Sequence, residues 1–468
     1  MNNYQNFLSK KVVTVKPSGF KAGFLNNSLF PFQQDIVRWA LEKGKAAIFA
    51  DCGLGKTLMQ LSWGQKVYEH IASEKKQDAY ILILAPLAVA MQTKEEGHKF
   101  GIEVTICRSE EELRPGLNIT NYERLDRFSS FNFDGVILDE SSILKSFMGK
   151  TKRQIVELFK NTPYRLACTA TPAPNDYMEL LNHAEFLGIM ESSKALSIWF
   201  INDTDSMGKY RIKSHAIKPF WEWVSTWAVC LGAPSDIGHS DEGFILPELR
   251  EYEHIVDVDV TSEDFTEGLF RKVETNATAF HAEKRRSAVD RAKNVAEIVN
   301  NNAEQYLVWC DTNYEADELK KLIPDAVEVR GSDKPEKKEQ AAIDFASGET
   351  RVLISKPSIF GFGLNFQQCQ NVVFCGLSYS YEDYYQAVRR VWRFGQKLPV
   401  NSHIVVGSTE LQILDTIRRK EKQHLNMKQQ MYGSIKQIQC DAIRGIQYKM
   451  DYSGRIEMKL PEWLKEVS

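Results

Sequence analysis

The chain has 468 residues, with 59 lysines and arginines against 62 aspartates and glutamates, so its formal net charge is only −3. This length accommodates two or more domains, each with its own core. The near-neutral charge excludes a global basic field, so any surface for a polyanion must be local. The eight cysteines include no Cys-x-x-Cys pair, which argues against a zinc ribbon or a disulfide framework. Because no apolar run is long enough to span a bilayer, we expect a soluble, cytoplasmic protein with no membrane partner.

Short apolar runs alternate with longer amphipathic stretches along most of the chain, which is typical of parallel sheets covered by helices. The predicted strands of the first half are residues 46–49, 80–85, 103–107, 135–138 and 165–168. Those of the second half are residues 306–310, 326–329, 352–354, 371–375 and 403–406. The pattern predicts an α/β fold with two lobes, each a mostly parallel sheet covered by helices.

The segment between the two halves has a different composition. It contains Trp199, Trp221, Trp223 and Trp227, shows few strand signals and ends in a stretch rich in glycine, serine and aspartate. Tryptophans at this spacing favour a helical core, although such rings also stack on bases. We therefore expect a helical insertion and linker here. The predicted divisions are a first lobe at 1–174, the insertion at 175–244, a second lobe at 245–428 and a tail at 429–468.

A glutamine lies just ahead of the first predicted helix. Gln33 follows Phe30-Pro31-Phe32 and precedes an amphipathic stretch at 35–43 that contains Trp39. A side-chain amide both donates and accepts hydrogen bonds, as the edge of an adenine requires, and a nearby aromatic ring can stack on a base. Gln33 is therefore a candidate adenine ligand, with a solvated amide as the plain alternative.

The strongest functional motif follows the first predicted strand, where residues 50–57 read Ala-Asp-Cys-Gly-Leu-Gly-Lys-Thr. Gly53 and Gly55 allow backbone N–H groups to close around the β- and γ-phosphates of a nucleotide, and Lys56 adds a positive charge there. The Thr57 hydroxyl is placed to hold Mg²⁺. The motif predicts a site for ATP and Mg²⁺, although a glycine-rich turn between a strand and a helix is the plain alternative.

Two acids end the predicted strand at 135–138. Asp139 is a candidate ligand of the Mg²⁺ that Thr57 also holds, and Glu140 is a candidate to orient or deprotonate the attacking water. The next strand leads into Thr169-Ala170-Thr171-Pro172. We expect the hydroxyls of Thr169 and Thr171 to hydrogen-bond the acids and to report the state of the nucleotide to the junction between the lobes.

Two arginines in the second half are candidates to complete this site from the other lobe. Arg390 and Arg393 are three residues apart within 386–396, which predicts that they share one helical face. There they would reach a γ-phosphate as arginine fingers when the lobes close. A basic helix face and a clamp for DNA phosphates are the alternatives. Upstream, the glycine-rich segment 361–366 follows a strand and allows close approach of the backbone.

The ordered set of motifs resembles the helicase-type motors of superfamily two, most closely the Swi/Snf branch of double-stranded DNA translocases. Gln33 with Trp39 resembles the Q-type motif of that branch, and residues 51–57 resemble motif I. The further matches are Ala85-Pro86-Leu87 with motif Ia, residues 120–123 with motif Ib, Asp139-Glu140 with motif II, residues 169–172 with motif III, 361–365 with motif V and 386–396 with motif VI.

The resemblance implies two tandem RecA-like lobes and roles for particular residues. Catalysis is assigned to Lys56, Asp139, Glu140, Arg390 and Arg393. Nucleotide binding is assigned to Gln33, Gly53, Gly55, Lys56, Thr57 and Gly363, with Thr57 and Asp139 holding Mg²⁺. Contacts to nucleic acid are assigned to Pro86, Thr120, Asn121, Tyr122 and Asn365.

The resemblance also implies a nucleic-acid-dependent ATPase that moves on duplex DNA, without sequence preference and as a monomer. Motif II departs from the family, because Ser141 and Ser142 stand where a small residue and a histidine that contacts motif III are usual. Compact motors of this kind resemble those of phages and prophages, which predicts a bacterial cell or a phage-infected host.

Two other functions stay open at this point. One is a helicase that separates strands or migrates branches at forks, junctions or R-loops. The other is a nucleotide-gated DNA-binding subunit of a restriction, methylation or recombination complex. The insertion and the C-terminal tail are candidate docking sites for a protein partner.

Overall fold

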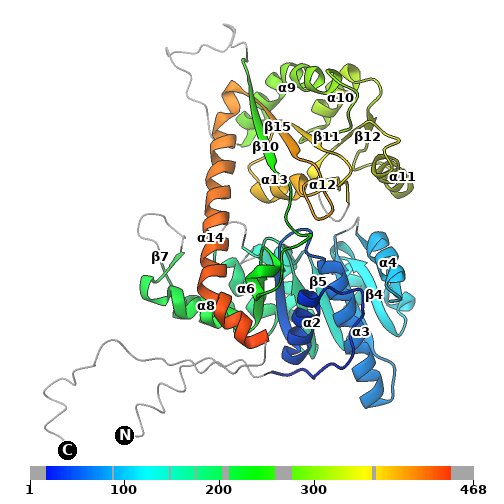
Figure 1. The fold of residues 1–468 in the computed structure, drawn as a ribbon, viewed down its shortest axis with the longest axis vertical. Helices are drawn as coiled ribbons and strands as arrows, with labels where there is room; N and C mark the ends of the chain where they lie inside the picture. The colour runs from blue at the N-terminus through cyan, green and yellow to red at the C-terminus, as the bar shows by residue number, and fades with distance from the viewer. Residues whose placement is uncertain are drawn as a thin grey trace, which may run out of the picture.

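The computed structural model describes residues 17–86, 89–146, 149–173, 176–202, 210–258, 277–360 and 365–443. Two lobes, each built around a sheet, lie one above the other, and the long helix α14 (Leu411–Ile443) runs alongside both (Figure 1). Within each of the two large sheets, the neighbouring strands that the structure describes are parallel. The prediction of two α/β lobes with parallel sheets is confirmed.

The sheet of the first lobe has the strand order β3-β4-β2-β5-β6-β1-β9. Its strands are β1 (Lys45–Ala50), β2 (Tyr80–Ala85), β3 (Val104–Ile106), β4 (Gly116–Asn121), β5 (Gly135–Asp139), β6 (Tyr164–Cys168) and β9 (Ala228–Leu231). The α-helices of this lobe are α2 (Pro31–Lys43), α3 (Lys56–Lys75), α4 (Ala90–Lys99), α5 (Lys150–Leu158), α6 (Glu179–Phe186), α7 (Ser192–Trp199) and α8 (Ile217–Ser225). The short 3₁₀ helices are η1 (Glu110–Glu112), η2 (Tyr122–Phe128), η3 (Ser141–Lys145), η4 (Ser214–Ala216) and η5 (Pro234–Ile237).

The apolar strands are buried on both faces because helices cover the sheet from both sides. Successive side chains of β1 point to opposite faces, as the pleat of a strand requires. Ala47 and Phe49 join one core cluster, whereas Ala46, Ile48 and Ala50 join the other. This two-sided burial explains why the strands read as continuous apolar runs in the sequence.

The segment expected to be an insertion is mostly helical, but it also completes the first sheet. Strand β9 pairs in parallel with β1 at the edge of that sheet. Trp221, Trp223 and Trp227 are at most 2% exposed and belong to a core cluster of the first lobe, so their interpretation as core residues is confirmed. The first lobe therefore continues beyond the boundary expected at 174. A short antiparallel hairpin, β7 (Phe200–Asn202) with β8 (Tyr210–Ile212), projects from this region.

The sheet of the second lobe has the strand order β10-β15-β14-β11-β13-β12. Its strands are β10 (Leu249–Val256), β11 (Tyr306–Cys310), β12 (Val327–Glu328), β13 (Val352–Ser355), β14 (Asn371–Cys375) and β15 (Val400–Gly407). The helices are α9 (Ala277–Asn300), α10 (Asn313–Leu322), α11 (Pro335–Ala346), α12 (Pro357–Phe360), α13 (Tyr381–Val388) and the 3₁₀ helix η7 (Ser408–Glu410).

Helix α14 returns from the second lobe to the first. It packs against α13, β15 and η7 of the second lobe, and against α2, α8, β9 and η5 of the first. The boundary expected between 428 and 429 falls inside this continuous helix. Among the described residues, no helix combines the length and the apolar character that a membrane crossing needs.

Candidate nucleotide site

The phosphate loop joins the end of β1 to the start of α3. Gly53 and Gly55 have φ of 88° and 74°, in the left-handed region that favours glycine. A Cβ on Gly55 would lie 2.3 Å from Nε2 of Gln33, and a Cβ on Gly53 would lie 2.8 Å from the backbone nitrogen of Phe394 in the second lobe. Both positions therefore need glycine for conformation, and Gly53 also needs it for space because its neighbour is backbone.

Lys56 begins α3, and its ammonium group lies at the loop. Nζ donates to the carbonyl of Ala50 at 2.9 Å and to that of Asp51 at 3.3 Å. Thr57 follows in the first turn of the same helix. The backbone of the loop, a cation and the N-terminus of a long helix thus lie together, and this donor set fits the phosphates of a nucleotide.

Gln33 lies directly against this loop. Its Nε2 donates to the carbonyl of Leu54 at 2.9 Å, and its Oε1 accepts from the backbone N–H of Phe30 at 2.9 Å. Helix α2, which begins at Pro31, holds the amide at this position. The structure links the Q-type motif to motif I, and adenine recognition by Gln33 stays a prediction.

The two acids lie at the carboxyl end of β5, which is separated in the sheet by β6 from β1 and the loop that follows it. Gln60 of α3 donates from Nε2 to Oδ1 of Asp139 at 2.7 Å, and the hydroxyl of Tyr122 donates to the Asp139 carbonyl at 2.7 Å. The Thr169 hydroxyl donates to Oε2 of Glu140 at 3.3 Å, as predicted. Thr171 donates instead to Glu382 of α13, at 3.4 Å, and so connects motif III to the second lobe.

Glu140 has a backbone conformation that is rare for a residue with a side chain. Its φ is 51°, and among the described residues Lys76 is the one other non-glycine with a positive φ. Such conformations cost free energy and are frequent at functional sites. Burial raises the pKa of Glu140 to about 7, with a further increase from Asp139 and an opposing effect of Lys56. Burial also raises the pKa of Asp139, whereas its hydrogen bond from Gln60 lowers it.

We expect ATP hydrolysis to increase with pH through about pH 7. Glu140 accepts a proton only as a carboxylate, and its pKa is raised from 4.5 to about 7, so the acid form dominates below that pH. The value of kcat/KM, measured between about pH 5 and pH 9, reports the free protein. Nucleotide affinity over the same range is the control. A flat profile down to about pH 5, as an unperturbed glutamate would give, contradicts the prediction.

The first serine after the acid pair contacts a histidine of another element, α6, whereas the family has a histidine within motif II itself. Ser141 Oγ lies 3.1 Å from Nε2 of His183 in α6, and the other ring nitrogen lies 3.2 Å from the carbonyl of Glu179. Burial lowers the pKa of His183 to about 4, so the ring is neutral at neutral pH. Motif II is thereby fastened to α6.

The arginines of the second lobe follow α13, but the helix expected to carry them ends at Val388. Residues 389–395 form turns and a bend, in which the Arg390 N–H donates to the Ala387 carbonyl at 3.2 Å and the Arg393 N–H to the Val391 carbonyl at 3.1 Å. The expectation of one shared helical face is therefore wrong. Arg390 is 4% exposed, and its guanidinium donates to the carbonyl of Gln386 at 3.0 Å and to its Oε1 at 3.1 Å.

The groups around Arg390 and Arg393 affect the pKa of each guanidinium and place both side chains at the interface between the lobes. Burial lowers the pKa of Arg390, whereas Cys52, Glu140 and Asp139 of the first lobe act in the opposite direction. Gln386 Oε1, which accepts from Arg390, lies 4.0 Å from Cys52 Sγ of the phosphate loop, and Phe394, the residue after Arg393, lies against Gly53. Burial lowers the pKa of Arg393 to about 10, and Arg390 adds to that decrease. The structure therefore brings both arginines to the interface that the phosphate loop faces.

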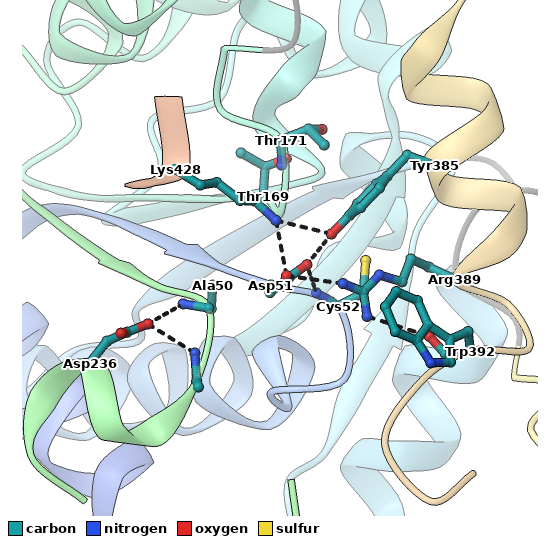
Figure 2. Close-up of polar contacts among 12 residues, drawn as sticks. Ala50, Asp51, Cys52, Thr169, Thr171, Asp236, Tyr385, Arg389, Trp392 and Lys428 are labelled. Atoms are coloured by element: carbon teal, nitrogen blue, oxygen red, sulfur yellow. Dashed lines mark hydrogen bonds and ion pairs between the residues drawn. The ribbon is translucent and has the colours of Figure 1, made fainter. Parts of the chain in front are cut away.

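A cluster of charges at Asp51 was not predicted from the sequence. Asp51 Oδ2 accepts from Arg389 at 3.1 Å and from Lys428 of α14 at 2.9 Å, and its Oδ1 accepts from the Tyr385 hydroxyl and, at 2.8 Å, from the Cys52 N–H (Figure 2). Burial alone would raise the pKa of Asp51, but the two cations hold it well below its usual range. The sequence gives one indication of this cluster, because the charged residue Asp51 directly follows an apolar strand.

The residues expected to contact nucleic acid are not all at the surface. Thr120 and Asn121 end β4 and are 2% and 6% exposed, and the Tyr122 hydroxyl supports Asp139. A direct contact to a phosphate would need exposed donors, so these three residues do not offer one in this conformation. Pro86 is half-buried after β2, and Asn365 is exposed. Gly363 and most of motif V lie outside the described residues.

Comparisons with known proteins identify two domains in the chain. A model of the SNF2-related domain matches residues 32–213, and a model of the helicase conserved C-terminal domain matches residues 290–395. The chain is 25% identical over 167 residues to a SWI/SNF-related matrix-associated actin-dependent regulator of chromatin subfamily A-like protein 1 of Xenopus laevis, which covers 33% of this chain and 17% of that protein.

A phage relative and a solved structure are also similar. Protein p41 of Acyrthosiphon pisum secondary endosymbiont phage 1 is 28% identical over 202 residues, or 38% of this chain and 40% of that protein. The Sulfolobus solfataricus SWI2/SNF2 ATPase core in complex with dsDNA is 17% identical, with a TM-score of 0.41, and the match covers 90% of this chain and 97% of that one. The chain thus matches less than half the length of these two curated relatives. With its two matched domains in order and motifs I to III and VI assembled between two parallel sheets, the chain is a Swi/Snf-like member of helicase superfamily two.

Proposed function

We propose that the protein is an ATP-dependent DNA translocase, a nucleic-acid-dependent ATPase that couples hydrolysis to movement on duplex DNA. The observation that carries the proposal is the composite site. A phosphate loop and an acid pair belong to the first lobe, and arginines of the second lobe lie at the same interface. Arg389 pairs with Asp51 at 3.1 Å, and Gln386 Oε1, which accepts from Arg390, lies 4.0 Å from Cys52 Sγ of the loop. A site divided in this way responds to the relative position of the lobes.

The first lobe supplies the groups for binding and proton transfer. The loop amides and Lys56 bind the phosphates of ATP, and Gln33 supports the loop beside the base. Thr57 and Asp139 would hold Mg²⁺, which would supply charge neutralisation at the phosphates. Glu140 accepts the proton of the attacking water, and its raised pKa suits a base near neutral pH.

The second lobe supplies the groups that make hydrolysis depend on closure. Arg390 and Arg393 stabilise the charge that develops on the transferred phosphoryl group. Two further contacts cross the interface, from Lys145 to Glu382 at 2.5 Å and from Thr171 to Glu382. They link motifs II and III to α13, so a change at the acid pair is transmitted to the other lobe.

Family membership supports a DNA partner, and the near-neutral net charge means that the surface for DNA must be local. We expect the lobes to contact phosphates through local donors, so binding is independent of sequence and weakens steeply with salt. Contacts to DNA through Pro86 and Asn365, a monomeric state and the cytoplasm of a bacterial or phage-infected cell are part of this proposal. We also predict that a protein partner binds at residues 175–244 or at the tail, residues 429–468. The structure describes only residues 429–443 of that tail.

The ATPase rate with different nucleic acids tests the function. We expect the highest rate with duplex DNA, a lower rate with single-stranded DNA and with RNA, and loss of the rate in Lys56→Ala. Stimulation by RNA alone contradicts a DNA translocase. Displacement of a labelled strand from a fork would identify a strand-separating helicase, and DNA binding without turnover would identify a nucleotide-gated subunit.

A further inference from the structure

Helix α14 belongs to the hydrophobic cores of both lobes. Ile413, Leu414 and Ile417 in its first turns are buried in a core cluster of the second lobe. Met427 and Met431, further along the same helix, are buried in a core cluster of the first lobe. Burial at both ends fixes the helix to each lobe, so any relative movement of the lobes must bend, rotate or unseat it.

Lys428 lies next to the first-lobe anchor and reaches the phosphate loop. Its Nζ is 2.9 Å from Asp51 Oδ2, 3.2 Å from the Tyr385 hydroxyl and 5.1 Å from the centre of the Tyr385 ring. The side chains of Lys428 and Asp51 are 12% and 11% exposed, so water screens this ion pair little. One helix turn earlier, His424 packs against the same tyrosine, at 5.6 Å between ring centres.

Asp51 in turn fixes both halves of the candidate site. Its backbone carbonyl accepts from Lys56, and its N–H donates to Leu231 of β9 at 3.0 Å, so its position sets the start of the phosphate loop. Its carboxylate holds Arg389, the residue directly before Arg390. Arg389 is further fixed by its position over the Trp392 ring, 4.4 Å from the ring centre. Tyr385 of α13, Arg389 directly after that helix and Lys428 of α14 all contact the Asp51 carboxylate. These contacts determine how the loop faces the finger arginines.

We propose that Lys428 is a positioning residue for ATP hydrolysis and that α14 transmits the relative position of the lobes to the phosphate loop. The proposal rests on the function proposed above, and it adds a residue outside the motifs of the family resemblance. Lys428 acts through Asp51 and does not contact the reacting atoms. The lysine and Arg389 together clamp Asp51, which keeps the loop and Arg390 in register while α14 is seated on both lobes.

Lys428→Met tests the proposal, because methionine keeps the aliphatic stem and removes the charge. We expect kcat of the DNA-stimulated reaction to fall by about 10- to 100-fold, since small misplacements of reacting groups have effects of that size. The KM for ATP should change by less than roughly threefold, because the direct phosphate ligands are intact. Lys428→Arg, which restores the charge, should recover most of kcat. Lys422→Met, at an exposed position of the same helix, is the matched control.

Hydrogen exchange provides a readout that does not depend on activity. Amides of residues 51–57 should exchange faster in Lys428→Met than in the wild type or in Lys422→Met, because the loop loses an anchor. If the wild type is active and Lys428→Met has the same kcat and the same loop exchange, the positioning role is overturned but the proposed function is not. A wild type without ATPase activity on any nucleic acid overturns the proposed function, and the loop exchange then still decides whether Lys428 anchors Asp51. Equal losses in the arginine and methionine variants would show that the charge is irrelevant and also overturn the proposal.

Discussion

Glu140→Gln should lower kcat for ATP hydrolysis by about 10²- to 10⁴-fold, the usual contribution of a positioned general base. Glutamine has nearly the same shape and keeps a carbonyl oxygen that can accept from Thr169, so the local structure should persist. It has no proton affinity near neutral pH, so the attacking water is not activated. Burial, with a smaller contribution from Asp139, makes a negative charge at Glu140 costly, as its raised pKa shows, so a neutral amide there should retain or increase nucleotide affinity.

The measurement combines phosphate release in a single turnover with a fluorescence titration of nucleotide binding. Glu157→Gln in α5 is the matched control, because its carboxylate is 75% exposed and pairs with Lys160 at the surface. A Glu140→Gln protein that hydrolyses ATP at the wild-type rate would remove this residue from the chemistry. A protein that no longer binds nucleotide would instead assign Glu140 to the binding of the phosphates or the metal.

Arg390→Ala should lower turnover by about 10³-fold or more, within the range known for arginine fingers, while ATP binding persists. Arg390 is the better placed of the two arginines, because it donates to Gln386 Oε1, which lies 4.0 Å from Cys52 Sγ of the phosphate loop. We therefore expect a smaller loss in Arg393→Ala. Arg390→Lys should not restore turnover, because lysine cannot reproduce the planar, two-pronged contact of a guanidinium.

Steady-state ATPase rates on duplex DNA, together with nucleotide titrations, check this prediction. Arg330→Ala is the control in the same lobe, since its guanidinium pairs with Glu328 at the edge strand β12. Near wild-type turnover in both Arg390→Ala and Arg393→Ala would refute the composite site, and with it the dependence of hydrolysis on lobe closure. Loss of nucleotide affinity in Arg390→Ala would mean that the arginine binds the ground state as strongly as the transition state.

The sequence predicted the central strands well because their burial on both faces produces uninterrupted apolar runs. The runs at 80–85, 306–310 and 371–375 coincide with β2, β11 and β14. Strand β4 was missed because it carries Asn118, whose buried amide is satisfied locally by the carbonyls of Arg114 and Gly116. Strand β10 was missed for a different reason, since it lies at the edge of its sheet and is largely exposed.

Local motifs made the groups of the first lobe predictable, whereas the contacts between distant segments depend on tertiary structure. The loop, Lys56 and the acid pair each lie at the end of an apolar run, so their chemistry is visible within a few residues. Gln60 was accessible in principle, because it lies one helix turn after Lys56 on the same face. The contact between Asp51 and Lys428 joins residues 377 positions apart, and no periodicity within either segment indicates it. The membership of β9 in the first sheet likewise depends on its pairing with β1.

The return of the chain to the first lobe limits how the motor can move. The polypeptide passes from the first lobe to the second between β9 and β10, and it comes back through α14, whose far end is packed on α8 and η5 (Figure 1). Two separate tethers define an axis, so opening is confined mainly to a swing about that line, and free separation of the lobes is suppressed. The same feature affects a fragment that contains only the second lobe and α14. Without the first lobe, Met427 and Met431 of this helix would be exposed to solvent, so the fragment would self-associate.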